Sequence, residues 1–222
     1  MQRISKFCKY LSRYGWEPII LTSRNASVDH EDPSLLKDVE DLRRVEKIEG
    51  WEPHTWFETL NKGRKSPRSK KGARKPEGWK QDLGEFVRLN VFVPDSRVGW
   101  NRPATRKGLD ILREEKPDVV FSTSPPYTPH LVARKLSRAA GIPHVVDYRD
   151  PWLENHAYNR SYRFPWVKAW NRWLESRILE GAAAVTAANP RLARLAAEKL
   201  PPSVREKVVS ISNGYDPDDI PE

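Results

Sequence analysis

Short apolar segments of strand type alternate with helix-type segments along this 222-residue sequence. A helix is indicated where apolar residues recur every three or four positions, and a buried strand where about four to eight of them run together. Alternation of this kind is typical of an α/β fold, here a Rossmann-like parallel sheet with helices on both faces. The predicted helices lie near 4–11, 107–116, 128–140, 165–179 and from 190, and the predicted strands near 18–22, 118–124, 144–148, 182–186 and 207–211.

The length suits one large α/β domain or two small ones. No apolar run approaches the roughly 18 to 20 residues needed to cross a bilayer, and no secretory signal follows Met1. We therefore expect a cytoplasmic protein. Cys8 is the only cysteine, which excludes an internal disulfide and a cysteine-based metal cluster. Its place on an apolar helix face predicts a core residue.

Charged side chains follow one predicted strand directly. The run from His144 to Trp152 begins as an apolar strand and then carries Asp147, Arg149 and Asp150 within four residues. Open parallel sheets bind ligands beyond the carboxyl ends of their strands, so these three residues are candidates for a catalytic site. Because side chains alternate along a strand, Asp147 and Arg149 are expected on one side, and Tyr148 and Asp150 on the other. The alternative is that Arg149 and Asp150 pair with neighbours and only order a loop.

A second polar group surrounds the end of the strand at 118–124. Thr128 is a candidate helix cap with Pro129 at the first helical position, and free backbone donors at such a helix start favour an anion. Ser124, Tyr127 and His130 lie around this point and are predicted to form a polar, substrate-binding rim. An exposed neighbour of the helix cap, without a ligand, is the other interpretation of His130.

The helix at 165–179 carries two features of open meaning. Glu175 is either a functional acid or a surface acid paired with Arg172 or Arg177. Three tryptophans are spaced by four and three residues, which places them on one helical face. Buried packing is the favoured use of this face and docking to lipid is the alternative. The three are Trp166, Trp170 and Trp173.

Much of the net charge of +9 comes from one segment. Residues 61–78 contain basic side chains interrupted by Gly, Ser and Pro, a composition that predicts a disordered loop. Nearby indoles at Trp51, Trp56 and Trp79 suit the headgroup layer of an anionic membrane. Phosphates of nucleic acid would suit the same charges, but no nucleic-acid-binding motif accompanies them, and a solvated loop is the third interpretation. The predicted membrane contacts are Lys65, Arg68, Lys70, Lys71, Arg74 and Lys75.

Several short motifs together resemble the amino-terminal half of family 4 glycosyltransferases. They cover nearly the whole chain and come in the family's order. The motifs are Gln2–Thr22, Pro117–Val120, Ser124–Pro126, Gly141–Pro143, Asp147–Trp152, Glu175 and Ile211–Asp216.

This resemblance implies the N-terminal domain of a GT-B architecture, in which two Rossmann-like domains face a cleft. The first domain binds the acceptor and the second binds a sugar nucleotide, and sugar is transferred with retention and without a metal. We expect residues 1–213 to form the acceptor-binding domain and residues 214–222 to begin a linker to the donor-binding domain. The family's first strand and its donor-binding glutamates have no counterpart in this sequence, so we expect a fragment that is inactive alone.

The resemblance also gives roles to particular residues. Arg149 lies where many relatives carry a histidine that faces the reacting sugar. A guanidinium stays protonated, so Arg149 is expected to hold a diphosphate or a hydroxyl group rather than to move a proton. Asn213 and Gly214 match the family's crossing to the donor domain and are expected near substrate. The implied function is polysaccharide assembly at the inner face of a bacterial membrane, with a glycan or lipid-linked acceptor, a nucleotide sugar and no further cofactor.

Overall fold

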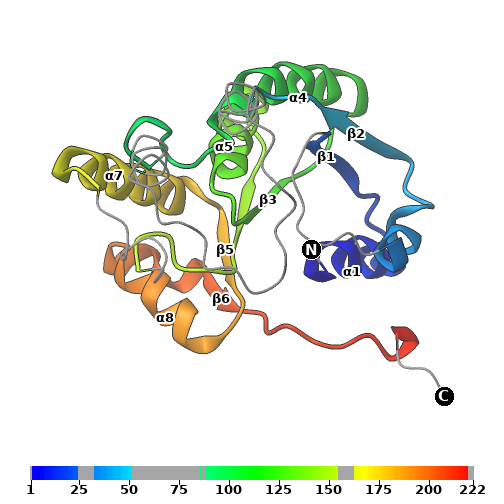
Figure 1. The fold of residues 1–222 in the computed structure, drawn as a ribbon. Coiled ribbons are helices and arrows are strands. Elements are labelled where there is room, and N and C mark those ends of the chain that lie inside the picture. The colour runs from blue at the N-terminus through cyan, green and yellow to red at the C-terminus, as the bar shows by residue number, and fades with distance from the viewer. Residues whose placement is uncertain (1, 25–32, 52–85, 87–88, 155–162, 220–222) are drawn as a thin grey trace, which may run out of the picture.

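The computed structural model of the protein describes residues 2–24, 33–51, 86, 89–154 and 163–219. Helices and strands alternate along these residues, as Figure 1 shows, and all strand pairs are parallel. The predicted α/β class is therefore confirmed. The helices are α1 (Gln2–Leu11), α4 (Asn101–Glu115), α5 (Thr128–Ala140), α7 (Pro165–Gly181) and α8 (Pro190–Glu198). The strands are β1 (Ile19–Ser23), β2 (Arg44–Ile48), β3 (Val120–Ser124), β4 (His144–Tyr148), β5 (Ala184–Ala187) and β6 (Val208–Ser210).

The strands form two parallel sheets rather than the single sheet that we expected. One sheet has the order β3-β4-β5-β6, and the other pairs β1 with β2. Among the described residues, no strand joins β1 to β3. The strand β2 was not predicted from the sequence, because Arg44, Glu46 and Lys47 interrupt its apolar positions.

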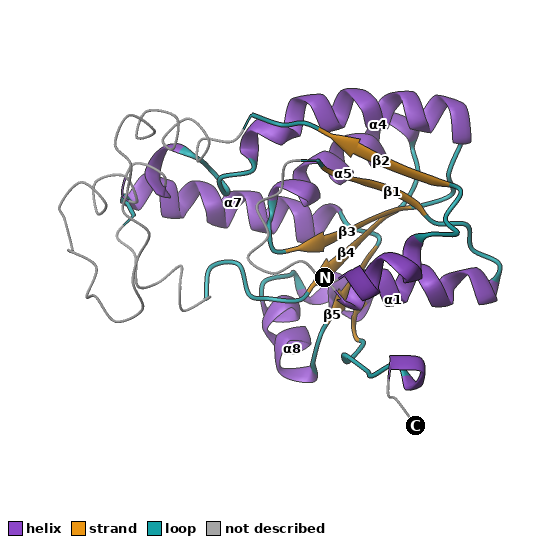
Figure 2. Cartoon of the chain, turned by 45° about the vertical axis from the view of Figure 1, so that its right-hand side comes forward, coloured by secondary structure: helices purple, strands orange, loops and turns teal. Residues whose placement is uncertain are grey.

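Helices cover both faces of the strands. In Figure 2, α4 and α5 lie on one side of the strands, and α1 and α8 lie on the other. α5 contacts β3 and β4, α8 contacts β5 and β6, and α4 contacts both β1 and β2.

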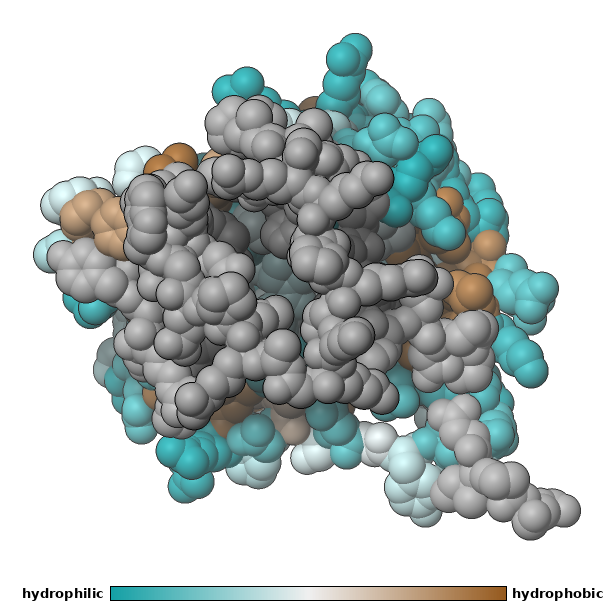
Figure 3. Space-filling model, viewed as in Figure 1, coloured by the Kyte–Doolittle hydropathy of each residue, from teal (hydrophilic) through white to brown (hydrophobic). Residues whose placement is uncertain are grey.

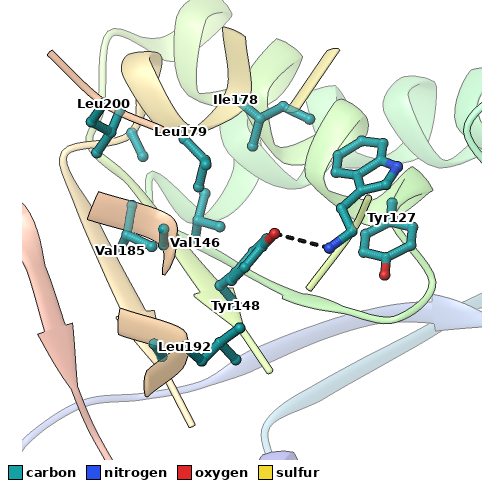
Figure 4. Close-up of a cluster of buried hydrophobic side chains, with 12 residues drawn as sticks. Tyr127, Val146, Tyr148, Ile178, Leu179, Val185, Leu192 and Leu200 are labelled. Carbon is teal, nitrogen blue, oxygen red and sulfur yellow. Dashed lines mark hydrogen bonds between the residues drawn. The ribbon is translucent and has the colours of Figure 1, made fainter. Parts of the chain in front are cut away.

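The main core lies between β4, β5 and the helices α7 and α8. Figure 4 shows Val146 and Val185 of the two strands packed against Leu179, Leu192 and other apolar side chains. Burying such side chains contributes roughly 1.5–3 kcal/mol each. Cys8 is buried on α1, as predicted, and burial raises the pKa of its thiol.

A second cluster holds α4 against α5 and reaches the two-stranded sheet. Trp100, Ala104, Val132 and Leu136 form its centre, and side chains of β1 and β2 pack against it. Gly108 permits this close approach, because a Cβ atom there would lie 2.5 Å from Cδ1 of Leu136. The two sheets are thus connected through a helix-covered core.

Charged residues gather over the outer end of α4. Figure 3 shows hydrophilic residues at the upper right, over α4 and β2. Arg44 forms ion pairs with Glu46, Glu114 and Glu115, and Arg43 pairs with Glu115. These exposed pairs contribute about 0–1 kcal/mol each and tie the end of α4 to β2.

The basic segment 61–78 lies outside the described residues, together with all its predicted membrane contacts. Trp56 and Trp79 lie outside them as well, whereas Trp51 is described and exposed. Within the described part of the chain, no helix has both the length and the apolar character required to cross a bilayer.

Candidate functional site at the carboxyl ends of the strands

Three neighbouring strands bring polar side chains into one row. The register pairs Thr123 of β3 with Asp147 of β4, and Asp147 with Thr186 of β5. Side chains that lie directly opposite in a sheet share a face. Both threonine hydroxyls accordingly donate a hydrogen bond to the Asp147 carboxylate. The oxygen–oxygen distance is 2.8 Å for Thr123 and 2.7 Å for Thr186.

An arginine from α1 completes this row. Arg3 donates from Nε and from its NH2 group to Asp147, at 3.2 and 3.0 Å, and its NH1 group donates to Oδ1 of Asn213 at 3.1 Å. Asp147 is fully buried, and there Arg3 neutralises its charge while the two threonine hydroxyls donate hydrogen bonds to it. Asp147 therefore holds Arg3 by an internal ion pair, and the catalytic role expected of Asp147 stays a prediction.

Arg3 is a site residue that sequence reasoning missed. A cation in the first turn of a helix opposes the helix dipole, which favours acids there. That local mismatch is the one signal that could have indicated a distant acidic partner. The partner, Asp147, is 144 positions away and could not be identified from the sequence.

Arg149 and Asp150 follow β4 directly. Nε of Arg149 donates to the carbonyl of Ser124 at 3.0 Å, and its NH2 group donates to that of Pro125 at 3.4 Å. These bonds fix the guanidinium at the end of β3, and its NH1 group has no partner among the described residues. Asp150 is partly buried and has no hydrogen bond or ion pair within the described part of the chain. Arg149 thus binds neighbouring backbone groups, as the loop-ordering alternative expects, whereas Asp150 has no such contact among the described residues.

A buried polar network lies behind this edge. Ser122 bonds through its hydroxyl to Nδ1 of His130 and to Nε2 of His144, at 2.7 Å each. Both histidines are buried, so the expectation that His130 is an exposed neighbour of the helix cap is wrong. The hydroxyl has one proton to donate; it donates to one imidazole and accepts from the other.

Both histidines of the network are neutral at pH 7. Burial, together with the charges of His144 and Arg149, lowers the pKa of His130 to about 3. Burial and the charge of Arg134 lower that of His144 to about 4. His130 is therefore unsuited to carry a proton during a reaction at neutral pH.

The start of α5 already holds an anion, which is the carboxylate of Asp95. It accepts hydrogen bonds from the backbone N–H groups of Tyr127 and Thr128, at 2.7 and 2.9 Å, and from the Thr128 hydroxyl at 2.8 Å. A carboxylate at this position is favoured by the helix dipole. Thr128 is thus bound by a capping residue and is not itself the cap, which corrects the sequence prediction.

Ser124 is fully buried and Tyr127 nearly so, and the Tyr127 hydroxyl donates to the carbonyl of Pro151. The predicted polar rim is therefore not exposed here.

Glu175 belongs to a buried cluster on the other face of β4. The Tyr148 hydroxyl donates to Glu175, and Nζ of Lys199 donates to Glu175 at 2.6 Å and to Glu154 at 2.7 Å. Figure 4 shows the Tyr148 hydroxyl accepting from the backbone nitrogen of Trp152, at 2.9 Å. The expected surface pairing of Glu175 with Arg172 or Arg177 is wrong. Burial raises the pKa of Glu175, and the charge of Lys199 opposes that rise.

The segment after β6 runs along α1. Asp216 is buried and accepts hydrogen bonds or ion pairs from Lys6 and Lys9, at 2.8 Å each, and from the Tyr10 hydroxyl at 2.6 Å. Hydrogen bonds from these groups hold the pKa of Asp216 below its ordinary value. Figure 1 shows this segment extending from β6 towards the carboxyl end of the chain. Asn213 and Gly214 are thereby exposed beside Arg3.

The candidate site thus combines the guanidinium of Arg149, the unpaired carboxylate of Asp150 and the amide of Asn213 near the carboxyl ends of parallel strands. Within the described ranges, no group of three or more His, Cys, Asp or Glu residues lies in a position to hold a metal ion.

Comparison with known proteins assigns a family. A family model described as "Glycosyl transferase 4-like domain" matches residues 2–214. No significant match is found among proteins of curated function.

Proposed function

Because the chain belongs to the glycosyl transferase 4-like domain family, we propose that it is the acceptor-binding domain of a retaining glycosyltransferase. The enzyme moves a sugar from a sugar nucleotide to a glycan or lipid-linked acceptor. It acts in surface polysaccharide assembly in the cytoplasm, at the inner face of the membrane. The sugar nucleotide is bound by a second domain that faces this one across a cleft.

The observation that carries this proposal is the pair of unneutralised charges after β4. Arg149 keeps its NH1 group free while its other donors are fixed on the carbonyls of Ser124 and Pro125. Asp150, the next residue, has no described partner for its carboxylate. Fixed charges that the protein itself does not neutralise are suited to a polar substrate with a diphosphate and hydroxyl groups.

Arg149 and Asp150 have different roles in the transfer, because one side chain is a cation and the other an anion. Arg149 holds a phosphate oxygen of the donor and stabilises the charge that develops when the bond from sugar to phosphate breaks. Asp150 accepts a hydrogen bond from the acceptor hydroxyl and orients it towards the sugar carbon. The proton of that hydroxyl passes to the departing phosphate, so no base from this domain is required.

Arg3 and Asn213 form the neighbouring wall of the site. Asp147 holds Arg3, and Arg3 holds the side chain of Asn213, next to Gly214. This chain of contacts fixes the segment after β6 against the sheet edge. The segment contributes exposed amide and backbone groups to acceptor binding. Ser124, Tyr127 and His130 support the site from beneath.

The basic segment 61–78 brings the domain to its acceptor by binding anionic lipid. Each cation near such a surface contributes about 1 kcal/mol. Replacing its eight basic residues between Lys62 and Lys75 by Gln is expected to weaken sedimentation with anionic vesicles and to lower its salt sensitivity.

The transfer activity can be tested directly. The protein that carries this domain together with its sugar-nucleotide-binding domain is incubated with a panel of sugar nucleotides and a lipid and glycan extract. We expect release of nucleoside diphosphate with one donor, a glycosylated product by mass spectrometry, and an anomeric configuration equal to that of the donor by NMR. Residues 1–222 alone are expected to give no release. Absence of transfer from every donor by a folded two-domain protein contradicts the proposed function, and inversion contradicts the retaining mechanism.

A further inference from the structure

Three tryptophans on the outer face of α7 are exposed to solvent. The relative exposures of Trp166, Trp170 and Trp173 are 64%, 60% and 56%. The sequence favoured burial of this face, and the structure shows the reverse: Val167 and Ile178 lie on the buried side of the same helix. Tryptophan is ordinarily well buried, and a contiguous exposed apolar patch marks an interaction surface.

The three exposed tryptophans share one face of α7 and form an aromatic strip along it. The ring of Trp166 stacks on that of Phe164 with centroids 4.2 Å apart, and Trp170 meets Trp173 edge to face at 6.3 Å. At about 1.5 Å rise per residue, the strip covers roughly 10 Å along the helix axis. A strip of this kind can lie flat on a plane.

Cations lie along and beyond the end of this strip. The guanidinium carbon of Arg177 is 5.9 Å from the centroid of the Trp173 ring. On the neighbouring helix α5, Nε of Arg134 lies 3.8 Å from the position of a Cβ atom built on Gly181, the last residue of α7. Arg138 lies one turn further along α5, and positive charge from Arg138 and Arg177 adds to burial in lowering the pKa of Arg134. Arg138 and Arg177 thus lie close enough to Arg134 for their positive charges to act on it.

No carboxylate pairs with these arginines among the described residues. Lys168 and Arg172, exposed on α7, also have no ion pair in the described part of the chain. Glu175 is directed inwards to Lys199, which leaves Glu180 as the exposed acid of the helix. The surface therefore combines an aromatic strip with excess positive charge, and it needs an anionic partner.

We propose that this surface, defined by Trp166, Trp170, Trp173, Arg134, Arg138 and Arg177, docks on an anionic phospholipid bilayer. Indole rings prefer the boundary between headgroups and hydrocarbon, where the ring is in an apolar layer and its N–H reaches polar groups. The arginines bind lipid phosphates by charge-assisted hydrogen bonds in the same plane. Aromatic side chains of α7 and basic side chains of α5 and α7, presented together, suit the interface of an anionic membrane.

This inference adds a described surface to the membrane contact in the proposed function, and it does not depend on the transferase chemistry. Bilayer docking by α7 and sugar transfer are measured by different readouts. The contribution of the basic segment 61–78 to vesicle binding is separated from that of α7 in a second background. In that background the basic residues of the segment are replaced by Gln, and every variant is measured again.

The test is co-sedimentation of the full chain with vesicles of phosphatidylcholine, with and without phosphatidylglycerol, at low and high salt. The variant Trp166→Ser/Trp170→Ser/Trp173→Ser should bind anionic vesicles about tenfold more weakly or worse, in both backgrounds and also at high salt. The variant Arg138→Gln/Arg177→Gln should lose mainly the salt-sensitive part of the binding. Trp16→Ser, which removes an exposed indole far along the sequence on the segment before β1, is the matched control and should bind like the parent.

Insertion of the indoles gives a second readout. Vesicles with brominated acyl chains should quench part of the tryptophan fluorescence of the parent and of Trp16→Ser. The same vesicles should quench a smaller part of the fluorescence of the triple variant. Circular dichroism and the Tm should show that the triple variant is folded, because the replaced side chains are exposed. Equal vesicle binding by the parent and the triple variant overturns the proposal, and so does a parent that binds no anionic vesicles. A parent that forms dimers lost in the triple variant, without vesicle binding, assigns the face to a second copy instead and also overturns it.

Discussion

Individual buried charges in this protein are neutralised by residues far away in the sequence. Asp147 is neutralised by Arg3, and Asp95 accepts from backbone groups at the start of α5. Strand alternation correctly placed Asp147 and Tyr148 on opposite faces of β4. It could not distinguish an acid that faces substrate from one that is paired internally, because the pairing partner comes from another element. At the end of β4, Arg149 and Asp150 have no ion pair among the described residues.

The pair of buried histidines should make stability fall in mild acid. In the unfolded chain each imidazole has its ordinary pKa of 6.5, whereas in the folded protein the pKa values are about 3 for His130 and about 4 for His144. Between pH 6.5 and about 4 the unfolded state therefore binds protons that the folded state does not. Each histidine should then remove about 1.4 kcal/mol of unfolding free energy per pH unit once its unfolded form is protonated.

Urea unfolding of the parent and of His130→Gln/His144→Gln, from pH 7 to pH 4.5, measures this dependence. The variant should have lower stability at pH 7 but a flatter pH dependence. NMR titration of the imidazoles in the parent gives a second check, since neither should protonate above pH 5 in the folded protein. Identical pH slopes for the two proteins, or an imidazole of either residue that titrates near 6.5, contradict the neutral buried pair.

Among the helices, α7 shows what a periodic pattern can and cannot predict. The predicted helix, 165–179, agrees with α7 to within two residues, but its periodicity favoured burial for the wrong face. The buried face contains Asn171 and Glu175, which look like surface residues by polarity alone. Both are satisfied inside: Asn171 accepts from Trp152 and donates to the carbonyl of Val167, and Glu175 binds Tyr148 and Lys199. The partners outside the helix, which are Tyr148, Trp152 and Lys199, cannot be identified from the sequence of the helix alone.

The pairing of α7 with the end of α8 should be strongly coupled. Lys199→Met leaves the carboxylate of Glu175 buried without its cation, and breaking such a pair costs about 3–5 kcal/mol when both partners are fully buried. Because Lys199 is partly exposed, we expect a smaller loss, of about 2 kcal/mol. Adding Glu175→Gln removes the unpaired charge and should restore much of the stability.

A double-mutant cycle by urea unfolding measures this coupling. Lys207→Met, which removes a lysine bonded to the backbone carbonyls of Glu180 and Ala182, is a control for loss of a lysine near α7. A Lys199→Met protein as stable as the parent, or a double variant less stable than the sum of the single changes, contradicts the assignment of Lys199 as the counter-ion of Glu175.

At the scale of the whole molecule, the alternation of elements gave the fold class, and the glycine at the end of α5 gave a helix boundary. Gly141 has φ of 70° and closes the helix as expected. The division into two sheets and the strand β2 were not predicted, because both depend on pairing between segments and β2 has no clear apolar pattern. Asp147 and Arg149 lie at the carboxyl end of β4 as expected, since strand ends are readable from sequence, and their place in a functional site stays a prediction. Only the contacts in the structure show that Arg3 and Asp147 are paired inside the protein. They also show that Arg149 and Asp150 have no ion pair among the described residues.

The most direct test of the account is the effect of Arg149→Ala on sugar transfer by the two-domain enzyme. We expect kcat/KM to fall at least tenfold, equivalent to about 1.4 kcal/mol of lost transition-state stabilisation, with an unchanged Tm. Arg113→Ala, which removes an exposed arginine near the opposite ends of the strands, is the control and should leave kcat/KM unchanged. Wild-type kcat/KM in a folded Arg149→Ala enzyme contradicts the assignment of the sheet edge as the site of transfer.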